Sequence, residues 1–527
     1  MKRILLLGAG FMQKPAIDCA KELGCFVTAV DGNPQAYCVP FVHRFEPIDL
    51  KDTEKLLSFA KHLQTTEGLD GVFTAGTDFS AAVSYIAEHC HLCGHSYEAA
   101  CNASDKIRMR ACFAKDGVPS PAFCEIDASF LSFSVDEILE KAGFSDYIQN
   151  FTCLVVKPVD NMGARGCRMV QVKEDLLDAL QTAIQYSRSG RAILEEYMDG
   201  PEFSLDSLVY DGKITITGFA DRHIFYPPYF IEMGHTMPTV LSEDEKNEVI
   251  RVFALGVKSL GLTCGAAKGD IKFTKKGVMI GEIAARLSGG YMSGWTYPYS
   301  SQINLTKEAL RIALGMKPSV NLAGGTLEGK FVSAERAWVS IPGKIKNIIG
   351  YEKARALPYV KEVFPRNYIG DTVNFPLNNV EKCGNIITQS ASYTEACLQA
   401  EKAVASIVLV LEKESALTEN FLNQSLAVQF PPAAFNFSEN FVQEFEASLQ
   451  KMDDVVSSRS LLEQMPPALQ KIQKTVTDWN HRTIEESLSL FSELCPHFKP
   501  IKASLFWHYL MRGGIQGILY LAEENTP

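Results

Sequence analysis

The sequence lacks any apolar run of the ~20 residues that a membrane-spanning helix needs, although 46% of its 527 residues are hydrophobic. This excludes an integral membrane protein. The basic and apolar start, residues 1–7, is followed by Gly8 and Gly10, too early for a secretory signal peptide, so we expect none. Basic residues are also few, because 51 Lys and Arg stand against 62 Asp and Glu, for a net charge of −11. This balance excludes a general nucleic-acid binder, which needs a broad basic surface.

The 14 cysteines are dilute and irregularly spaced, and they give no disulfide framework. Cys90 and Cys93 form a C-x-x-C pair among three histidines, but the sequence does not continue with the two further well-spaced ligands of a zinc ribbon. Since unpaired cysteine is usually a small buried hydrophobe, we interpret these residues as reduced and structural, with a metal site as the alternative. Reduced thiols indicate a cytoplasmic protein.

The length suits three or four domains of roughly 150 residues each, and 21% charged residues are typical of globular chains. In the first 103 residues, short apolar runs at 3–7, 25–30 and 71–75 alternate with helix-like stretches. This alternation predicts a parallel, doubly wound sheet. Gly8-x-Gly10 followed by Asp31 suggests a dinucleotide site, and with it an oxidoreductase, but Gln13 occupies the place of the third glycine.

Further along the chain, local signals predict individual elements. Ser104 is expected to cap a helix that starts after it, and Ser242 with Glu245 forms a capping box at the start of another. Asp211-Gly212 predicts a tight hairpin. A helix is expected over 393–411.

Lys157 ends a predicted strand, residues 153–159, and precedes a loop at 160–167 that contains two glycines and Arg165. An ammonium group in a buried strand is costly unless an anion meets it. Glycines let backbone N–H groups close around phosphate oxygens, and an arginine adds a charged fork. The pattern therefore indicates a phosphate site, although a snorkelling lysine beside an ordinary hairpin is the alternative.

Two carboxylates are predicted to face each other across a hairpin whose turn is 274–277. Strand alternation places Lys268 and Asp270 on one face, and Glu282 and Arg286 on one face of the return strand. Two carboxylates at close range repel unless they share a proton or a divalent ion. Magnesium held by one or two carboxylates plus substrate phosphates fits this arrangement, and a surface salt-bridge ladder is the alternative.

A third acidic segment comprises Glu195, Glu196, Tyr197 and Met198, with Glu202 shortly after. A strand edge that leads into a linker can hydrogen-bond an adenine edge through its backbone, and a later carboxylate can reach ribose hydroxyls. Acidic residues in a turn are more often only solvated. This segment therefore indicates a nucleotide site only in combination with the glycine loop and the carboxylate pair.

In this order, these motifs resemble the ATP-grasp superfamily over residues 1 to about 413. The resemblance implies an α/β fold with an N-terminal Rossmann-like domain, ATP-grasp α+β subdomains and a lid similar to the C-terminal part of biotin carboxylase. A mainly helical domain of no assigned chemical role would follow. The implied domains are 1–103, 104–330 with the glycine-loop subdomain in 104–200, 331–413 and 414–527.

The resemblance also implies roles for site residues. Lys106 and Lys157 would hold ATP phosphates, beneath a loop that includes Asn161, Gly163, Arg165 and Gly166. Residues Glu195, Glu196, Tyr197 and Met198 would line the adenine pocket, and Glu202 would bind the ribose. Asp270 and Glu282 would hold Mg²⁺ or Mn²⁺, while Arg286 would face the acyl phosphate and Lys268 the tetrahedral intermediate.

Within the superfamily the chain is similar to the L-amino acid ligase group, notably at residues 282–286. It departs from the common pattern at Ala284, where many relatives carry a metal-binding asparagine. The segment 231–238 also resembles a substrate-side segment of these ligases, which makes Glu232 and His235 substrate candidates of second rank.

The resemblance predicts an ATP- and magnesium-dependent carboxylate–amine ligase that joins small molecules through an acyl phosphate. Homodimers are common in similar proteins. One alternative is a bicarbonate-activating carboxylase, for which a biotin carrier would have to be a separate chain. Another is a nucleotide-binding regulatory protein that has lost catalysis, an alternative that Ala284 and the C-terminal extension keep open.

Overall fold

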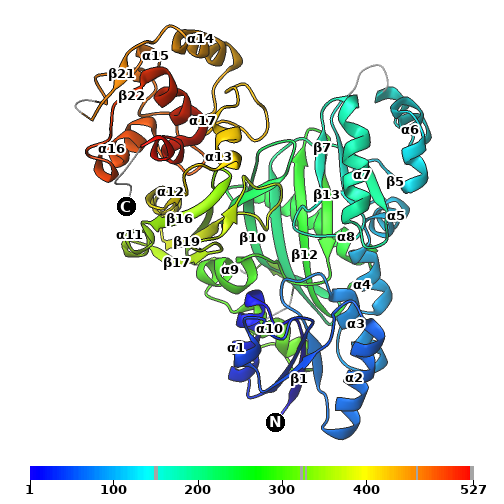
Figure 1. Cartoon of the computed structure of the whole chain (residues 1–527). Coiled ribbons are helices and arrows are strands. Elements are labelled where there is room, and N and C mark those ends of the chain that lie inside the picture. Colours follow the sequence, from blue (N-terminus) through cyan, green and yellow to red (C-terminus); the bar gives the residue numbers. More distant parts are fainter. Residues whose placement is uncertain (148–151, 321–323, 327–328, 459–460, 523–527) are drawn as a thin grey trace. The chain divides into compact units, whose positions relative to one another are not determined.

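The computed structural model describes residues 1–147, 152–320, 324–326, 329–458 and 461–522. The chain forms two compact units, and the first comprises Met1–His223 and His235–Ser333. The second comprises Ile224–Gly234 and Ala334–Pro527. Each unit contains both strands and helices (Figure 1).

The N-terminal part of the first unit is a parallel four-stranded sheet with helices on both faces, as predicted. Strand order is β3-β2-β1-β4, and all three pairs are parallel. Alternate residues of β1 bury into two separate cores: Ile4 and Leu6 pack towards α1 and α10, and Leu5 and Leu7 towards α2 and α3. The elements are β1 (Arg3–Leu7), α1 (Lys14–Glu22), β2 (Phe26–Asp31), β3 (Arg44–Pro47), α2 (Thr53–Thr66), β4 (Gly71–Phe73), α3 (Ser80–His89), α4 (Tyr97–Ser104) and α10 (Leu305–Ala313).

Gln13 lies next to the residues that follow β4, near the strand ends where a doubly wound sheet binds dinucleotides. The buried Gln13 side chain donates from Nε2 to the Ala75 carbonyl at 2.8 Å and accepts from the Ala75 N–H at 3.0 Å. Asp31 accepts from the Ala9 and Asn33 N–H groups at 2.8 and 2.9 Å. The Gln13 amide and the Asp31 carboxylate therefore both form hydrogen bonds within the protein, and the dinucleotide interpretation has no support in the structure.

A second sheet, antiparallel and ordered β5-β8-β6-β7, carries the glycine loop between β6 and β7. Its apolar face is covered by α6 and α7, through a core that includes Leu154, Leu180 and Leu194. The elements are β5 (Phe123–Ile126), α6 (Val135–Lys141), β6 (Leu154–Pro158), β7 (Arg168–Val170), α7 (Leu176–Tyr186) and β8 (Ala192–Glu196).

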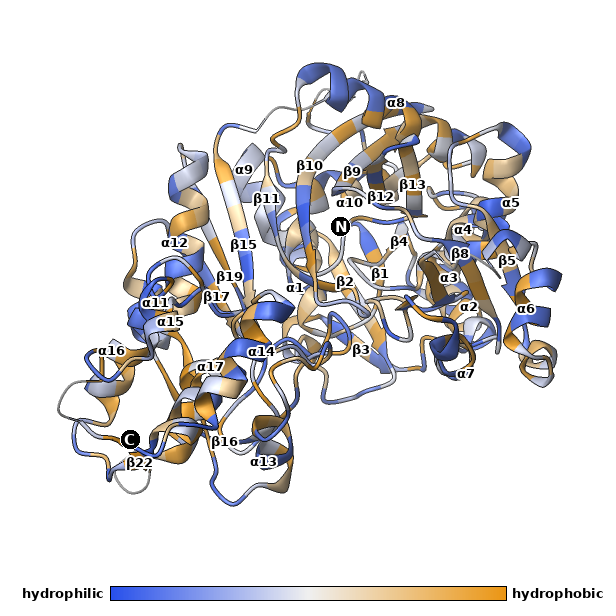
Figure 2. Ribbon diagram, turned by 90° about the horizontal axis from the view of Figure 1, so that it is seen from above, coloured by the Kyte–Doolittle hydropathy of each residue, from blue (hydrophilic) through white to orange (hydrophobic). Residues whose placement is uncertain are grey.

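The remaining sheet of the first unit has the order β13-β12-β9-β10, and its neighbours are antiparallel. The helices α5 and α8 cover it, and α8 presents both hydrophilic and hydrophobic turns, as expected of a helix with one buried face (Figure 2). The predicted Ser242–Glu245 capping box is present. The elements are α5 (Lys106–Asp116), β9 (Glu202–Tyr210), β10 (Lys213–Phe225), β11 (Ile231–Met237), α8 (Glu243–Ser259), β12 (Gly265–Thr274), β13 (Gly277–Ala284), α9 (Tyr297–Ser301) and β14 (Gly325–Thr326).

The second unit is built on one hydrophobic core that runs from Trp338 through Val410 to Trp507. The strands β15-β19-β17 and β18-β16-β20 share this core with the C-terminal helices. The elements are β15 (Val332–Trp338), β16 (Gly343–Ile349), α11 (Tyr351–Ala356), β17 (Val360–Pro365), β18 (Thr372–Val373), β19 (Gly384–Ser390), α12 (Tyr393–Ser406), β20 (Val408–Leu411), α13 (Ala416–Leu422), α14 (Glu439–Leu449), β21 (Val455–Val456), α15 (Pro467–Gln470), α16 (Ile484–Leu494), β22 (Ile501–Lys502) and α17 (Ala503–Leu521).

Two local predictions are wrong. The helix expected over 393–411 ends at Ser406, and Val408–Leu411 is a strand paired with β16, because a run rich in β-branched residues finds a partner strand. Ser104 does not cap the following helix; it is the last residue of α4. Asp105 caps α5 instead, accepting from the N–H groups of Ile107 and Arg108.

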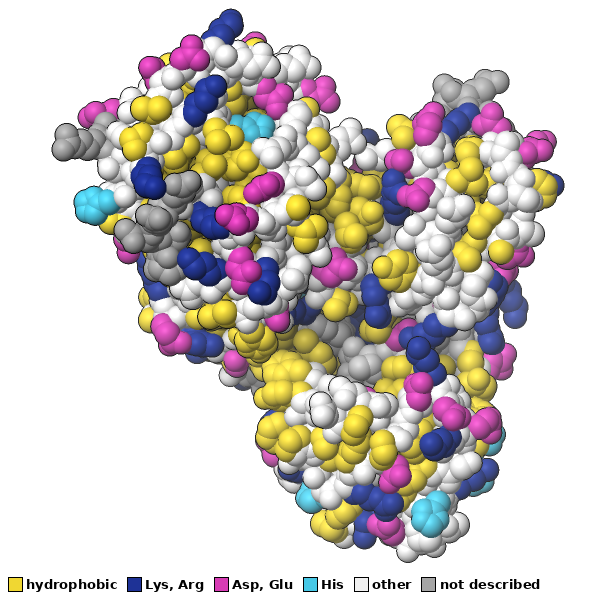
Figure 3. Space-filling model, viewed as in Figure 1, with side chains coloured by type: hydrophobic (Ala, Val, Ile, Leu, Met, Phe, Trp, Pro, Cys, Tyr) yellow, Lys and Arg dark blue, Asp and Glu magenta, His cyan; other side chains and the backbone are white. Residues whose placement is uncertain are grey.

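Charged side chains of both signs are interspersed on the face shown in Figure 3. Among the described residues, the helices are all too short or too polar to cross a membrane.

We expect Gln13→Ala to lower the free energy of unfolding by about 2 kcal/mol, because the buried N–H and carbonyl of Ala75 would both lose their partner. Hydrogen exchange at residues 71–75 and the urea midpoint measure this change. The exposed Gln35→Ala is the matched control and should leave both unchanged. Equal exchange in the two variants would contradict the bridging role of Gln13.

Candidate functional site

The hairpin of β12 and β13 places Asp270 directly opposite Glu282, as the sequence pattern predicted. A bulge follows Asp270, so the register shifts beyond this pair. Lys268 lies opposite Ala284 on one side and Asp206 of β9 on the other. The two carboxylates therefore occupy adjacent strands at one level of the sheet.

Three cations surround these carboxylates. Lys106 Nζ lies 3.5 Å from Glu282 Oε1, Lys268 pairs with Asp270, and Arg222 Nη1 lies 2.9 Å from Asp270 Oδ1. Burial acts to raise the pKa of Glu282, but Lys106, Lys268 and Arg286 outweigh it and lower the pKa to about 2. Glu282 is therefore a permanent anion at neutral pH.

Lys106 also ties the start of α5 to the glycine loop. Its backbone N–H donates to the Val159 carbonyl and its Nζ to the Asn161 carbonyl, both at 3.1 Å. Burial acts to lower the pKa of Lys106, yet Glu282 and other nearby acids raise it above its usual value. The ammonium is therefore kept charged where helix, loop and hairpin meet.

Lys157 belongs to a buried charge triad. Its Nζ lies 2.6 Å from Glu195 Oε2, and Arg110 Nε lies 2.7 Å from Glu195 Oε1. Glu195 is 1% exposed; burial acts to raise its pKa, but Arg110 and Lys157 lower it below the usual value. The structure thus brings Glu195 to Lys157, where it orients the ammonium.

The glycine loop uses left-handed backbone conformations at Gly163, Ala164 and Gly166, with φ of 70°, 60° and 69°. A Cβ on Gly166 would lie 2.8 Å from the Cβ of Tyr186, so only glycine fits this approach. Arg165 Nε donates to the Met162 carbonyl at 3.1 Å. The Arg165 side chain is thereby folded back onto its own loop.

The segment that follows β8 lies along β12. Lys272 Nζ donates to the Met198 carbonyl at 3.1 Å and lies 4.9 Å from the centre of the Tyr197 ring. Glu196 pairs with Lys276. Glu202 pairs with Arg222 and lies 3.5 Å from Lys272. The predicted adenine and ribose residues therefore gather at the end of β12 that is remote from Lys268.

Arg286 stands just after β13, on a loop held by Asp206. The Ser288 N–H and hydroxyl donate to Asp206 Oδ1 at 2.9 and 2.7 Å. Burial raises the pKa of Asp206 to about 6, although Ser288 and Lys268 act to lower it. Because Asp206 is fixed in the central strand β9, it fixes the loop that carries Arg286.

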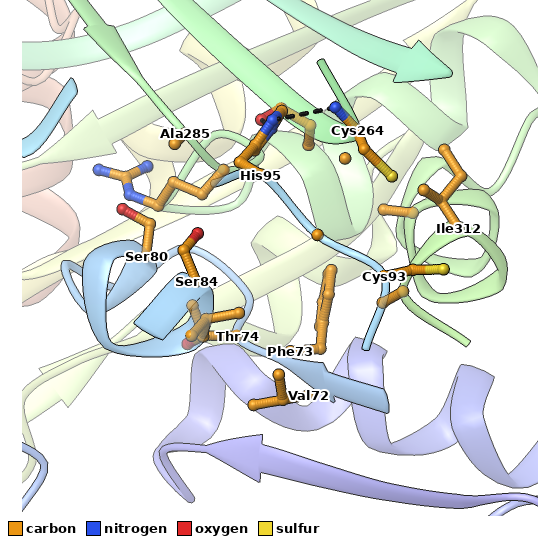
Figure 4. A pocket seen from close by; sticks show the side chains of 17 residues that line it. Val72, Phe73, Thr74, Ser80, Ser84, Cys93, His95, Cys264, Ala285 and Ile312 are labelled. Atoms are coloured by element: carbon orange, nitrogen blue, oxygen red, sulfur yellow. Dashed lines mark hydrogen bonds between the residues drawn. The ribbon is translucent and has the colours of Figure 1, made fainter. Parts of the chain in front are cut away.

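A small pocket of about 50 Å³ lies beside Arg286 (Figure 4). Most of its wall is apolar, with Ser80 and Ser84 as polar groups. His95 is structural here: its Nδ1 accepts the Cys264 N–H at 3.2 Å, and its Nε2 lies 3.0 Å from the Ala266 carbonyl. The lining residues are Val72, Phe73, Thr74, Ser80, Val83, Ser84, Cys93, Gly94, His95, Cys264, Gly265, Ala266, Ala285, Arg286, Ala309, Ile312 and Ala313.

The donor set fits a magnesium ion held jointly with phosphates. Within the described residues, no three His, Cys, Asp or Glu side chains gather as a metal cluster, and the predicted carboxylates Asp270 and Glu282 form a pair. Magnesium is commonly bound by one or two carboxylates with substrate phosphates and water. The residues therefore suit the ion, with Ala284 offering no side-chain ligand.

Some residues of this group came to light only in the structure. Sequence reasoning missed the partners Arg110, Arg222 and Asp206, although Arg110 lies four residues after Lys106 on the same helix. Glu232, whose N–H donates to Asn379 Oδ1 at 2.7 Å, belongs to the second unit, and His235 is buried in β11. Their role as substrate residues stays a prediction.

Comparisons with known proteins identify two domains within the chain. Residues 150–294 match the ATP-grasp domain model, and residues 337–412 match the model of L-amino acid ligase C-terminal domain 2. The L-amino acid ligase from Bacillus licheniformis is similar in structure, with a TM-score of 0.66 and 20% identity over 78% of this chain and 99% of that one.

Two curated proteins are similar in sequence. The uncharacterized protein y4rH of Sinorhizobium fredii is 20% identical over 74% of this chain and 79% of its own length. Carnosine synthase 1 of Mus musculus is 23% identical over 60% of this chain, which spans 40% of that protein. The segment predicted as lid-like thus matches a domain of L-amino acid ligases, and the chain contains an ATP-grasp domain, as its motifs predicted.

Proposed function

We propose that the protein is an ATP- and magnesium-dependent ligase that joins a small carboxylate, such as an amino acid, to an amine through an acyl phosphate. The observation that carries the proposal is the pair Asp270 and Glu282, opposed across a hairpin and surrounded by cations beneath a glycine loop. Two carboxylates can bind a metal ion, and the cations around them can bind the phosphates of a nucleotide.

The nucleotide would lie along β12. Lys106 and Lys157 would hold its phosphates, with the loop residues Asn161, Gly163, Arg165 and Gly166 above them. The backbone of residues 195–198 would meet the adenine edge, and Glu202 the ribose. Lys157 is well placed for this, because Glu195 holds its ammonium at 2.6 Å while Arg110 keeps that carboxylate paired.

The first step would be attack of a substrate carboxylate oxygen on the γ-phosphorus, with ADP leaving and an acyl phosphate forming. Arg286 would bind the carboxylate and turn it towards the phosphate. The amine would then attack the acyl carbon and lose a proton as inorganic phosphate departs. Lys268, between Asp270 and Asp206, would stabilise the oxyanion of the tetrahedral intermediate.

When bound by Asp270 and Glu282, magnesium would neutralise the charge on the phosphates and orient them. The low pKa of Glu282, about 2, keeps that ligand ionised at physiological pH.

The pocket beside Arg286 favours a substrate with a small apolar side chain. Val72, Phe73 and Ile312 supply its apolar wall, and Arg286 lines the same space. A carboxylate bound by Arg286 could therefore place its side chain in the pocket. The name L-amino acid ligase of a structurally similar protein supports amino acids as the substrates to try first.

A screen of amino acids and small carboxylates, alone and in pairs, tests the proposal, with phosphate release and mass spectrometry of the product as readouts. We expect phosphate release that depends on both an acid and an amine. ATP binding with no turnover across the screen would favour the regulatory alternative, and turnover that depends on bicarbonate would favour the carboxylase.

Lys157→Ala should abolish ATP turnover and leave the fold intact, because Glu195 keeps Arg110 as its partner. ATP affinity by calorimetry and turnover by phosphate release measure the effect, and circular dichroism checks the fold. The exposed Lys213→Ala is the control and should behave like the wild type. Near-normal turnover in the Lys157 variant would refute the phosphate-site assignment.

Glu282→Gln should raise the magnesium concentration needed for half-maximal ATP binding and turnover by about tenfold or more, because one anionic hard ligand is lost. Magnesium titrations at fixed ATP measure the shift. Glu243→Gln, whose side chain is 81% exposed at the start of α8, is the control. An unchanged magnesium requirement would mean that Glu282 is not a metal ligand.

A further inference from the structure

The glycine loop is fastened at its first residue to the segment that follows α7. Asp160 accepts three hydrogen bonds of 2.8 Å, from the Ser187 hydroxyl and from the N–H groups of Arg188 and Ser189. Burial acts to raise the pKa of Asp160, but these hydrogen bonds lower it below the usual value. The base of the loop and residues 187–189 therefore form one fixed piece.

Arg188 extends from this piece to the N-terminal sheet. Its Nη2 lies 3.1 Å from Asp78 Oδ2, and its guanidinium lies 5.4 Å from the centre of the Phe79 ring. Asp78 and Phe79 belong to the loop between β4 and α3. The Arg188 side chain thus connects the glycine-loop subdomain to the N-terminal domain.

The loop that carries Asp78 abuts the loop that carries Arg286. A Cβ on Gly76 would lie 3.0 Å from the Gly289 Cα, and one on Gly289 would lie 3.1 Å from the Gly76 carbonyl oxygen. Gly289 directly follows Ser288, which Asp206 holds. Contacts therefore run without a gap from the glycine loop, through Arg188, to the loop that carries Arg286.

Resting on the proposed function, we propose that Arg188 and Asp78 are positioning residues that latch the glycine loop over the nucleotide in register with Arg286. The pair is partly solvated, with side-chain exposures of 39% and 20%, and such ion pairs contribute at most about 1 kcal/mol. A contact this weak can open to admit ATP and close again. In the closed state it keeps water from the activated acid, so that phosphate transfer stays coupled to amide formation.

Arg188→Ala should lower kcat by on the order of tenfold and raise the ADP formed per product, because a displaced loop both misplaces the phosphates and admits water. Arg188→Lys should retain part of the coupling between ATP use and product. The double variant that exchanges the two charges, Asp78→Arg with Arg188→Asp, should be better coupled than either of its single variants. Lys173→Ala, which removes an ion pair with Asp136 inside the same subdomain, is the control.

Hydrogen exchange of residues 160–167 with Mg²⁺ and ATP gives a readout that needs no substrate. It should be faster in Arg188→Ala than in the wild type and unchanged in Lys173→Ala. If the wild type makes product and Arg188→Ala shows the same coupling and exchange, the latch is wrong while the proposed function stands. If no substrate pair is turned over, the exchange result alone decides between a latch and an incidental pair.

Discussion

The candidate site depends on holding two carboxylates, Asp270 and Glu282, opposite each other across one hairpin. Like charges at this range repel unless nearby cations offset them. Lys106, Lys268 and Arg222 offset this repulsion, and they come from helix α5, strand β12 and strand β10. Much of the architecture around the hairpin can be understood as holding these cations in place, so that a polyphosphate meets a fixed set of charges.

The cations are in turn fixed by buried or structural partners. Lys157 is oriented by Glu195, and Glu195 is kept charged by Arg110. Arg110 and Glu195 are both buried, so this ion pair keeps the carboxylate paired even when Lys157 is removed. In a similar way, Asp206 fixes the loop that carries Arg286, because it accepts hydrogen bonds from Ser288. Strands and the start of α5 thus carry the proposed phosphate-binding and metal-binding groups, whereas the proposed latch of the glycine loop is a weaker, partly solvated contact of Arg188.

Sequence patterns predicted what depends on local periodicity. Alternation along two strands and a short turn sufficed to pair Asp270 with Glu282, and a buried lysine before a glycine loop marked Lys157. The partners Arg110, Arg222 and Asp78 were missed, because each meets its site through tertiary contacts that no spacing encodes. The 407–411 segment was taken for helix since its partner strand lies some 60 residues earlier. Gln13, which stands where the third glycine of a dinucleotide motif would be, is hydrogen-bonded to the backbone of Ala75.

The most direct test of the account follows an oxygen atom. With the carboxylate substrate labelled with ¹⁸O, attack on the γ-phosphorus should transfer one labelled oxygen to the phosphate that the wild-type protein releases, which mass spectrometry of the phosphate detects. Recovery of one label per phosphate is the result that an acyl phosphate predicts. Phosphate that carries no label, alongside normal amide formation, would contradict activation of the acid by ATP at this site.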